Sequence, residues 1–272
     1  MVAALTLDLK NSQKYDLMRR NDLQKYLIDI TDKLNLVFHG SLLRELRFNG
    51  GDEIQGLFQE PGNAFLCLRL FHRCLHKIPF HAGIGIGEWS TVIDNKDTFY
   101  QDGSAYHRAR KAIELSKKEK EYTAVISSGT GRDPVLNAML NSCFQLMAKS
   151  TESQNTLLLL FECCYPLQSS VQINLNALEK LLPVVFRDYR VSRTPVLSET
   201  AEAYIQDSDT SNDSLVFQDA HPFGAAKRLA DIMGSTRQNI DKALYATNVY
   251  AERAAALALL FELRAFVSDN NT

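Results

Sequence analysis

Two aspartates of this 272-residue chain occupy positions from which their carboxylates could hold a metal ion together. Asp8 lies within an alternating run of apolar residues, and Asp52 ends the turn-forming tetrapeptide at residues 49–52. If the strands that carry them are neighbours in one sheet, the carboxylates repel each other, and a shared divalent cation removes that repulsion. Oxygen ligands suit Mg²⁺ or Mn²⁺, which also hold nucleotide phosphates. The alternative is structural, because aspartate is common at strand ends and in turns.

A second group of residues, near the C-terminus, has the spacing of a helix-turn-helix motif. Ala230 is the small residue needed where two helices cross, Gly234 tolerates the left-handed conformation of the turn, and Ile240 is the branched residue that faces inward. Ser235 is predicted to cap a second helix that begins at Thr236. In this motif the second helix lies in the major groove of DNA.

The exposed side of that second helix carries side chains suited to double-stranded DNA. Arg, Gln and Asn can each form two hydrogen bonds with guanine or adenine, and Ser and Thr commonly contact phosphate. The predicted DNA-binding residues are Ser235, Thr236, Arg237, Gln238, Asn239 and Lys242. The alternative is a helical hairpin that packs against another protein.

The C-terminal segment carries little charge for a protein that binds DNA as a single copy. From Gly224 onward it has six Lys and Arg residues against five Asp and Glu residues. A homodimer would double the contact with DNA. The final helix offers either a dimer surface or a surface packed on its own domain, through Val249, Ala256, Leu257, Leu260, Leu263 and Phe266.

The hydrophobic pattern predicts the elements that would position these residues. Alternation indicates strands at 3–10, 43–48, 53–58, 80–87 and 122–127. Helical spacing indicates helices through Leu23, Leu27, Ile30 and Leu34, at 64–75 and at 103–118. The glycines at 83, 85 and 87 lie within a strand, unlike a dinucleotide-binding motif, and predict a close approach by a bound base or a neighbouring helix.

The predicted order of elements is βαββαβ, followed by a further helix and strand. The first six elements are those of a ferredoxin-like fold, for which we expect one sheet with helices on one face. We therefore predict an α+β protein with a ferredoxin-like domain at residues 1–130. A helical connecting region with a polar linker at 131–216 and an all-α region with the helix-turn-helix at 217–272 would follow.

Composition excludes some classes of protein. The chain has 30 Lys and Arg residues against 32 Asp and Glu residues, a net charge of −2 that excludes a basic nucleic-acid coat and a polybasic membrane binder. Its five cysteines include no C-x-x-C pair and are predicted to be buried thiols. The N-terminus lacks a basic leader, and apolar runs such as 157–161 are too short to cross a membrane. We predict a cytoplasmic protein with no membrane partner.

Four segments resemble, in order, motifs of the class III nucleotidyl cyclases. Residues 7–12 resemble the first metal-binding motif, and 50–54 resemble the second and the GGDEF signature of diguanylate cyclases. Residues 81–88 resemble the Gly-x-x-x-Gly-Glu strand, and 103–111 resemble the helix that carries an Asn and an Arg. The resemblance implies a palm-type domain with Asp8 and Asp52 as ligands of Mg²⁺ or Mn²⁺. It also implies nucleotide-binding roles for Lys10, Asn11, Ser12, Gly51 and Glu53.

Together with the helix-turn-helix, these segments resemble the SatD family over nearly the whole chain. The sequence departs from the cyclases where they use an Asn to orient the ribose and an Arg to stabilise the transition state. These positions hold His107 and Lys111, with Arg108 and Arg110 beside the latter. The candidates for a catalytic role are His107, Arg110 and Lys111, residues that are equally typical of a solvated helix surface.

Two functions are consistent with these patterns. The first is a transcription regulator in which the palm domain binds a metal-nucleotide ligand and biases a DNA-binding helix-turn-helix. The second is a Mg-dependent nucleotidyl transferase or cyclase that uses the helix-turn-helix for docking. A scaffold with a degenerate palm domain is a third alternative.

Overall fold

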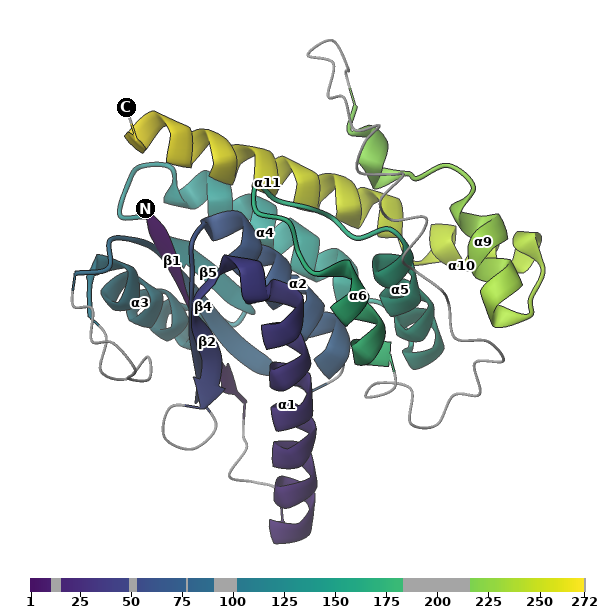
Figure 1. The fold of residues 1–272 in the computed structure, drawn as a ribbon, viewed down its shortest axis with the longest axis horizontal. Helices are drawn as coiled ribbons and strands as arrows, with labels where there is room; N and C mark the ends of the chain where they lie inside the picture. The colour runs from purple at the N-terminus through teal and green to yellow at the C-terminus, as the bar shows by residue number, and fades with distance from the viewer. Residues whose placement is uncertain (11–15, 49–52, 77, 91–101, 183–215, 272) are drawn as a thin grey trace.

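The computed structural model describes residues 1–10, 16–48, 53–76, 78–90, 102–182 and 216–271, which form a mixed structure of helices and one five-stranded sheet (Figure 1). The strands are β1 (Val2–Leu9), β2 (Leu42–Phe48), β3 (Glu53–Phe58), β4 (Phe80–Gly87) and β5 (Ala124–Ser127). The helices are α1 (Leu17–Phe38), α2 (Pro61–Leu75), α3 (Ser104–Lys118), α4 (Asp133–Met147), α5 (Glu152–Cys164), α6 (Leu175–Leu178), α9 (Ala225–Met233), α10 (Arg237–Ala246) and α11 (Val249–Asn271). Short 3₁₀ turns are η2 (His39–Ser41), η4 (Glu179–Leu181) and η5 (Gln218–Ala220). The prediction of an α+β protein is confirmed at this level.

The sheet has the strand order β2-β3-β1-β4-β5, so that β1 lies at its centre. β1 is antiparallel to both of its neighbours, β2 is antiparallel to β3, and β5 is parallel to β4. The register places Asp8 opposite Glu53 on one side and opposite His81 on the other. Since paired residues point to the same face of a sheet, these three side chains share one face.

Helices cover both faces of the sheet. Leu5 and Leu7 of β1 enter the large core beneath α1 and α2, whereas Ala4 lies with Ala105 and Ala109 of α3 in a separate, smaller core. Figure 1 shows α3 on the opposite side of the sheet from α1 and α2. The expectation of helices on one face was therefore wrong, because Ala4 of β1 and the glycines of β4 form a surface of small residues on the second face, on which α3 packs.

The glycines of β4 allow α3 to lie directly on the strand. A Cβ atom at Gly83 would overlap the carbonyl of Ala109, and one at Gly85 would overlap the carbonyl of Ala105. The sequence predicted that either a bound base or a neighbouring helix approaches these glycines, and in the described structure it is the neighbouring helix α3. The close approach fixes the height of α3 above the sheet, and with it the positions of the side chains that α3 carries.

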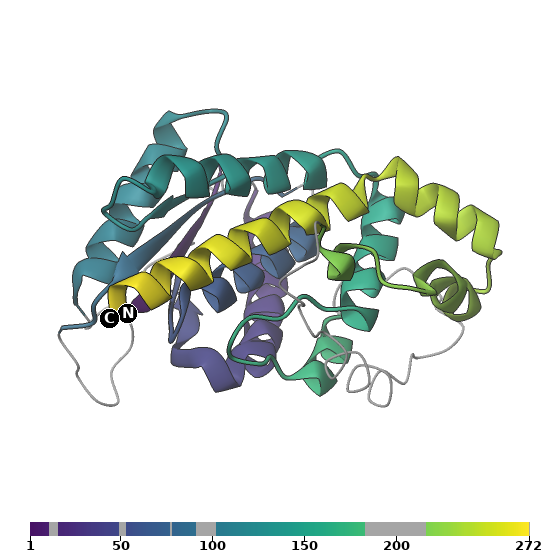
Figure 2. The ribbon, with the colours of Figure 1, turned by 90° about the horizontal axis from the view of Figure 1, so that it is seen from above.

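The C-terminal helix α11 packs along α4 and across α2, as Figure 2 shows from above. The apolar stripe considered as a dimer surface belongs to the protein's own core, in which Leu257 is partly buried and the others are fully buried: Val249, Ala256, Leu260, Leu263 and Phe266. The alternative, packing on its own domain, is the correct one for this stripe. The same core contains Leu5 of β1, so it extends through all three predicted regions, whose boundaries at 130 and 216 stay a prediction.

An ionic cluster lies inside this core, between α2, α5 and α11. Arg69 forms paired hydrogen bonds with Glu162, at 2.6 and 2.7 Å, and with Glu252, both at 2.6 Å. Arg253 also donates to Glu162, at 3.1 Å, and Arg73 donates to Glu252, at 3.2 Å. Burial opposes the charge of Glu252, but Arg69 and Arg73 outweigh it and lower the pKa of Glu252 to about 2.

Nothing in the sequence pattern indicated this cluster, because Arg and Glu in helices usually mark solvated surfaces. The cysteines behave as predicted: all five are buried and free. None of the described helices has both the length and the apolar character needed to cross a membrane.

Candidate functional site

The first candidate site is a group of charged and polar residues where β1 ends, which we call the sheet-end cluster: Asp8, Lys10, Glu53, His81 and Lys117. Asp8 lies between Glu53 and His81 in the sheet. Lys117 reaches the cluster from α3, with its Nζ 2.8 Å from Oδ2 of Asp8. The side chains of Asp8 and Lys117 are 23% and 34% exposed, so the cluster is accessible from solvent.

Lys117 remains a cation in this setting. Burial lowers the pKa of its ammonium group, but the hydrogen bond and charge of Asp8, with a smaller effect of Glu114, outweigh burial and raise the pKa overall. The Nζ of Lys117 also lies 3.4 Å from Oε1 of Glu114. Burial lowers the pKa of Lys10, the second lysine of the cluster.

His81 is a neutral base in the same cluster. Its Nδ1 lies 2.8 Å from the hydroxyl of Ser116, which in turn donates to the carbonyl of Thr123 at 2.9 Å. Since the hydroxyl proton is used there, we assign the proton of the His81 ring to Nδ1, which donates to Ser116. Burial, followed by the positive charge of Lys10, lowers the pKa of His81 to about 4, so the ring is uncharged at pH 7.

His81 was not among the predicted site residues. Its sequence signal is its place in the strand that resembles the cyclase motif, two residues before Gly83 on the same face. Of the predicted nucleotide-binding residues, Lys10 and Glu53 belong to the sheet-end cluster. Asn11, Ser12, Gly51 and the second predicted metal ligand, Asp52, lie outside the described residues, so the approach of Asp52 to Asp8 stays a prediction.

The described part of the sheet-end cluster does not fit Mg²⁺ or Mn²⁺. Within the described ranges, no group of three His, Cys, Asp or Glu side chains is arranged to hold a metal ion. The carboxylate of Asp8 is paired with the ammonium group of Lys117. A divalent cation at Asp8 would meet that positive charge at short range, which opposes its binding.

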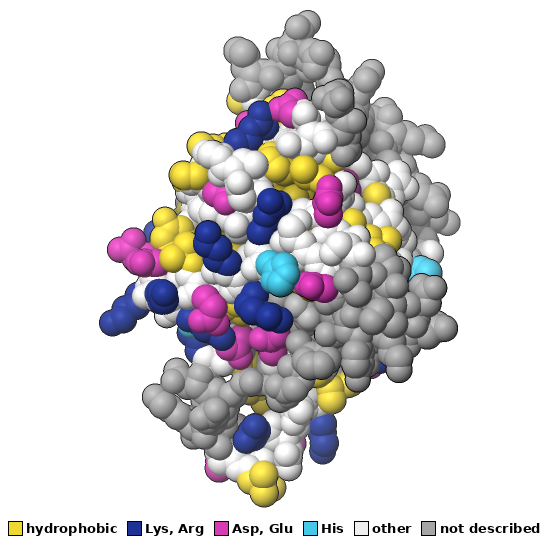
Figure 3. All heavy atoms as spheres, turned by 90° about the vertical axis from the view of Figure 1, so that its left-hand side faces the viewer, with side chains coloured by type: hydrophobic (Ala, Val, Ile, Leu, Met, Phe, Trp, Pro, Cys, Tyr) yellow, Lys and Arg dark blue, Asp and Glu magenta, His cyan; other side chains and the backbone are white. Residues whose placement is uncertain are grey.

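The three candidates for catalysis lie on the outer surface of α3. His107, Arg110 and Lys111 are exposed, and Nε2 of His107 is 3.1 Å from Oδ1 of Asp102. At about 1.5 Å per residue, His107 is ~15 Å along the helix from Lys117. Figure 3 shows basic and acidic side chains interleaved over this side of the molecule, as on a solvated surface. The structure therefore does not bring these candidates together with Asp8.

The residue between them, Arg108, points the other way. Its guanidinium donates to the carbonyl of Ile86 at 2.5 Å and also packs against Gly129. Arg108 thus joins α3 to the end of β4 and to the segment after β5. This is a structural role, which its position in the sequence did not distinguish from that of its exposed neighbours.

The second candidate site is the helical hairpin of α9 and α10. Gly234 ends α9 with φ at +62°, the left-handed conformation predicted for it. The apolar side of the hairpin is buried, as expected, at Leu229, Ala230, Ile240 and Leu244. Thr236 is the N-cap of α10, since its hydroxyl accepts a hydrogen bond from the backbone N–H of Asn239 at 3.2 Å.

The prediction of Ser235 as this cap was wrong by one residue. Both side chains can cap a helix, and only the backbone path of the turn selects Thr236. The six residues predicted to bind DNA are all exposed: Ser235, Thr236, Arg237, Gln238, Asn239 and Lys242. The hairpin lies at the end of the molecule opposite α3 (Figures 1 and 2).

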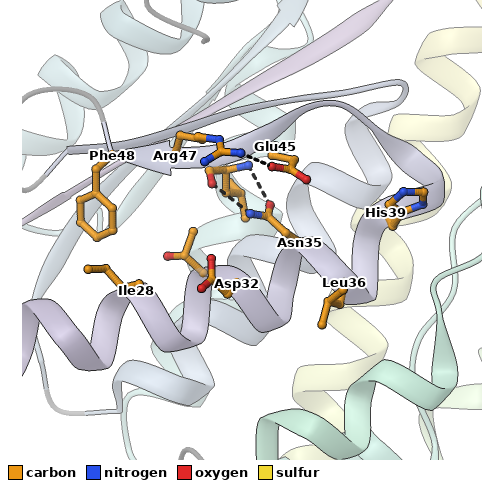
Figure 4. A pocket seen from close by; sticks show the side chains of 10 residues that line it. Ile28, Asp32, Asn35, Leu36, His39, Glu45, Arg47 and Phe48 are labelled. Atoms are coloured by element: carbon orange, nitrogen blue, oxygen red, sulfur yellow. Dashed lines mark hydrogen bonds and ion pairs between the residues drawn. The ribbon is translucent and has the colours of Figure 1, made fainter. Parts of the chain in front are cut away.

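A groove of about 540 Å³ lies between α1 and β2, apart from both candidate sites (Figure 4). The side-chain amide of Asn35 crosses its floor, donating to the carbonyl of Leu46 at 3.0 Å and accepting from its N–H at 2.8 Å. These bonds replace strand pairing where β2 departs from regular register with β3. None of the predicted site residues lines the groove. The hydrogen bonds of Asn35 on its floor hold the edge strand β2 in place.

Comparison with known proteins gives one assignment. No curated protein matches the chain. The sequence model of the SatD family matches residues 2–181, which span the whole sheet and the helices through α6 but not the hairpin of α9 and α10. The chain therefore belongs to the SatD family.

Proposed function

We propose that this SatD-family protein is a cytoplasmic, DNA-binding transcription regulator. In this proposal α9 and α10 form a helix-turn-helix, and the sheet domain binds a nucleotide that changes the affinity of this helix-turn-helix for DNA. The observation that carries the proposal is the hairpin itself. It combines a left-handed glycine turn at Gly234 and a buried apolar side with a second helix whose exposed residues include Arg237, Gln238 and Asn239. Such a helix fits the major groove, where these side chain types discriminate bases.

The sheet supports a nucleotide-binding role for the N-terminal domain. Its first four strands have the order and antiparallel pairing expected of a ferredoxin-like palm domain. At one end of the central strand, the sheet-end cluster presents Lys10 and Lys117 to solvent-borne phosphate groups, with His81 as a neutral hydrogen-bonding partner. The role of the palm domain as a ligand sensor belongs to the proposal.

The ionic cluster in the core connects the sheet domain with the DNA-binding hairpin and could transmit the effect of a bound nucleotide. α11 begins three residues after α10 ends, and its Glu252 is bonded to Arg69 of α2, the helix packed beneath the sheet. A ligand that shifts the sheet against α2 would act on the helix that follows the DNA-binding hairpin. Coupling of this kind requires a ligand with different affinities for two arrangements of the domain.

For the homodimer that the proposal includes, the candidate contact is the outer side of α11. Phe261 is 62% exposed there, in line with Ala254, Ala258 and Ala265. Phe261→Ser should shift the sedimentation coefficient from that of a dimer to that of a monomer and weaken binding to DNA. A wild-type protein that sediments as a monomer would remove the dimer from the proposal.

The experiment that tests DNA binding starts with selection of genomic fragments by the wild-type protein. Recovered fragments are then titrated with wild type, with Arg237→Ala/Gln238→Ala, and with Arg110→Ala/Lys111→Ala as a control that changes exposed residues at the far end of the molecule. We expect the first variant to lose affinity by about tenfold or more. The control should bind like wild type. Equal binding by all three proteins, or no selected fragment, would contradict the proposal.

The second candidate function is a Mg-dependent nucleotidyl transferase or cyclase that makes a nucleotide signal. It is favoured by the register of Asp8 with Glu53, the residue that follows Asp52 in the chain. Incubation with Mg²⁺ or Mn²⁺ and each nucleoside triphosphate, followed by chromatography, tests for a new nucleotide. The absence of product with every triphosphate rules this function out.

A further inference from the structure

We infer that Lys117 takes the place of a divalent cation at Asp8, so that this end of the sheet meets nucleotide phosphates with ammonium groups and without metal. The inference rests on the nucleotide binding proposed above and departs from the metal ligands predicted from the sequence. It names the ligand class as phosphate groups that are not chelated to Mg²⁺.

The geometry of the pair carries the inference. The Nζ of Lys117 lies 2.8 Å from Oδ2 of Asp8, a full hydrogen-bonded ion pair. A metal ion bound to the same carboxylate would lie within a few ångströms of the ammonium group, where repulsion between cations is strong. The charge of Asp8 is therefore already compensated by Lys117, which weakens the attraction of this carboxylate for a metal ion.

The pair is held by the fold rather than by chance contact of two flexible side chains. Lys117 lies in the last turn of α3, one residue after Ser116, whose hydroxyl bonds to His81 and to the carbonyl of Thr123. His81 is the register partner of Asp8 on β4. The same contacts that seat the end of α3 on the sheet thus set the position of Lys117 over Asp8.

The groups around the Asp8–Lys117 pair favour binding of a phosphate group over binding of a metal ion. An ammonium group has three donors, and Asp8 and Glu114 account for two of those of Lys117. The third can meet a phosphate oxygen. Lys10 supplies a second positive charge close to His81. The described carboxylates around the two lysines are Asp8, Glu53 and Glu114, so a phosphate would be held by the remaining ammonium donors and not by an excess of positive charge.

Titration with Mn²⁺ alone tests the replacement of metal by Lys117. Electron paramagnetic resonance reports free Mn²⁺ in the presence of wild type, Lys117→Met, Lys117→Met/Asp8→Asn, and Lys118→Met as a control at the adjacent exposed lysine. We expect Lys117→Met to bind Mn²⁺ on the order of tenfold more tightly than wild type, because its ammonium group no longer opposes the metal. Asp8→Asn should abolish that gain, and Lys118→Met should behave like wild type.

Two results would overturn the inference. One is Asp8-dependent binding of Mn²⁺ by wild type that is as tight as that of Lys117→Met. The other is a folded Lys117→Met protein, verified by its thermal unfolding curve, that binds no more Mn²⁺ than Lys118→Met does. Neither readout depends on DNA, on nucleotide or on enzymatic activity.

Binding of ATP and GTP by calorimetry, in EDTA and in Mg²⁺, tests the phosphate part. We expect a nucleotide that binds to do so at least as tightly in EDTA, and Lys117→Met to weaken that binding by about fivefold, as for loss of one charged contact. A strict requirement for Mg²⁺ would contradict the inference. If no nucleotide binds in either buffer, the proposed ligand is wrong, whereas the Mn²⁺ titration still decides the role of Lys117.

Discussion

Arg69 of α2 and Glu252 of α11 are 183 residues apart in the chain, and their side chains form two parallel hydrogen bonds of 2.6 Å in the core. Each side chain is 1% exposed. Glu162 of α5 holds the other edge of the same guanidinium. One arginine thereby fixes the relative positions of three helices, one beneath the sheet and one that continues from the proposed DNA-binding hairpin.

Removal of this arginine should be among the most destabilising single changes in the protein. We expect Arg69→Met to lower the free energy of unfolding by ~3–5 kcal/mol, because two buried carboxylates lose their shared partner. Urea unfolding followed by circular dichroism measures the change. The control is Arg132→Ala, which breaks an exposed pair with Asp269 of the same 2.6 Å length and should cost less than about 1 kcal/mol. Equal losses in the two variants would show that burial does not set the strength of the pair.

The glycines of β4 give a second prediction. Gly85→Ala places a methyl group against the backbone of α3 at Ala105 and Ala109, so the helix must move. We expect a loss of ~1–3 kcal/mol in the free energy of unfolding. Gly131→Ala is the control, since a methyl group there meets no atom within 4 Å and should change stability by about 0.5 kcal/mol at most. A stable Gly85→Ala protein would mean that α3 does not rest on β4 as described.

The cap of α10 can be assigned by a matched pair of variants. Thr236→Ala removes the hydroxyl that accepts from the N–H of Asn239 and should cost the helix about 1 kcal/mol. Ser235→Ala removes a hydroxyl with no role in the cap and should leave the helix unchanged. Native-state hydrogen exchange of the α10 amides measures both effects locally. Faster exchange in the Ser235 variant alone would restore the assignment made from the sequence.

Acid should weaken the fold through a buried histidine before it protonates the carboxylates. Burial lowers the pKa of His72 from 6.5 to about 3, and its ring packs 4.9 Å from that of Phe144. Below pH 6.5, His72 therefore binds a proton in the unfolded chain but not in the folded chain. The free energy of unfolding consequently falls as the pH decreases. His81 acts in the same direction, with its pKa at about 4.

Between pH 6.5 and 5 the carboxylates of the unfolded chain stay largely ionised, since their ordinary pKa is 4.5. The decline in this window is then due to the histidines. His72→Phe, which keeps a ring of similar shape but binds no proton, should flatten the dependence of unfolding on pH in urea titrations. An unchanged slope in this variant would exclude His72 as its source.

Much of the local structure was predictable from the sequence. The bounds of β3 and β4 agree with the alternating pattern, and Gly234 has the turn conformation assigned to it. These features depend on neighbours in the chain, since alternation and the tolerance of glycine for positive φ are local properties. The N-cap of α10 could not be predicted in this way, because Ser235 and Thr236 are both good capping residues and only the conformation of the turn distinguishes them.

The candidate site was less predictable. Asp8 was singled out, but the partner found for it is Lys117, which lies on a helix 109 residues later in the chain. Only the register of β1 with β4 and the seating of α3 on the glycines bring the two together. His81 was missed for the same reason, since its nearness to Asp8 is a property of strand pairing rather than of spacing in the sequence.

The sequence by itself determined where the strands of the sheet and the helices beside them lie, and where the chain turns. It did so because backbone conformation and side-chain periodicity act over a few residues. The tertiary structure alone decided what each apolar face packs against, so that the stripe of α11 became core, and which charges are buried. Taken singly in the sequence, Arg69, Glu162 and Glu252 are residues typical of a protein surface. They can be buried only because three helices pack together and bring each charge next to an opposite one.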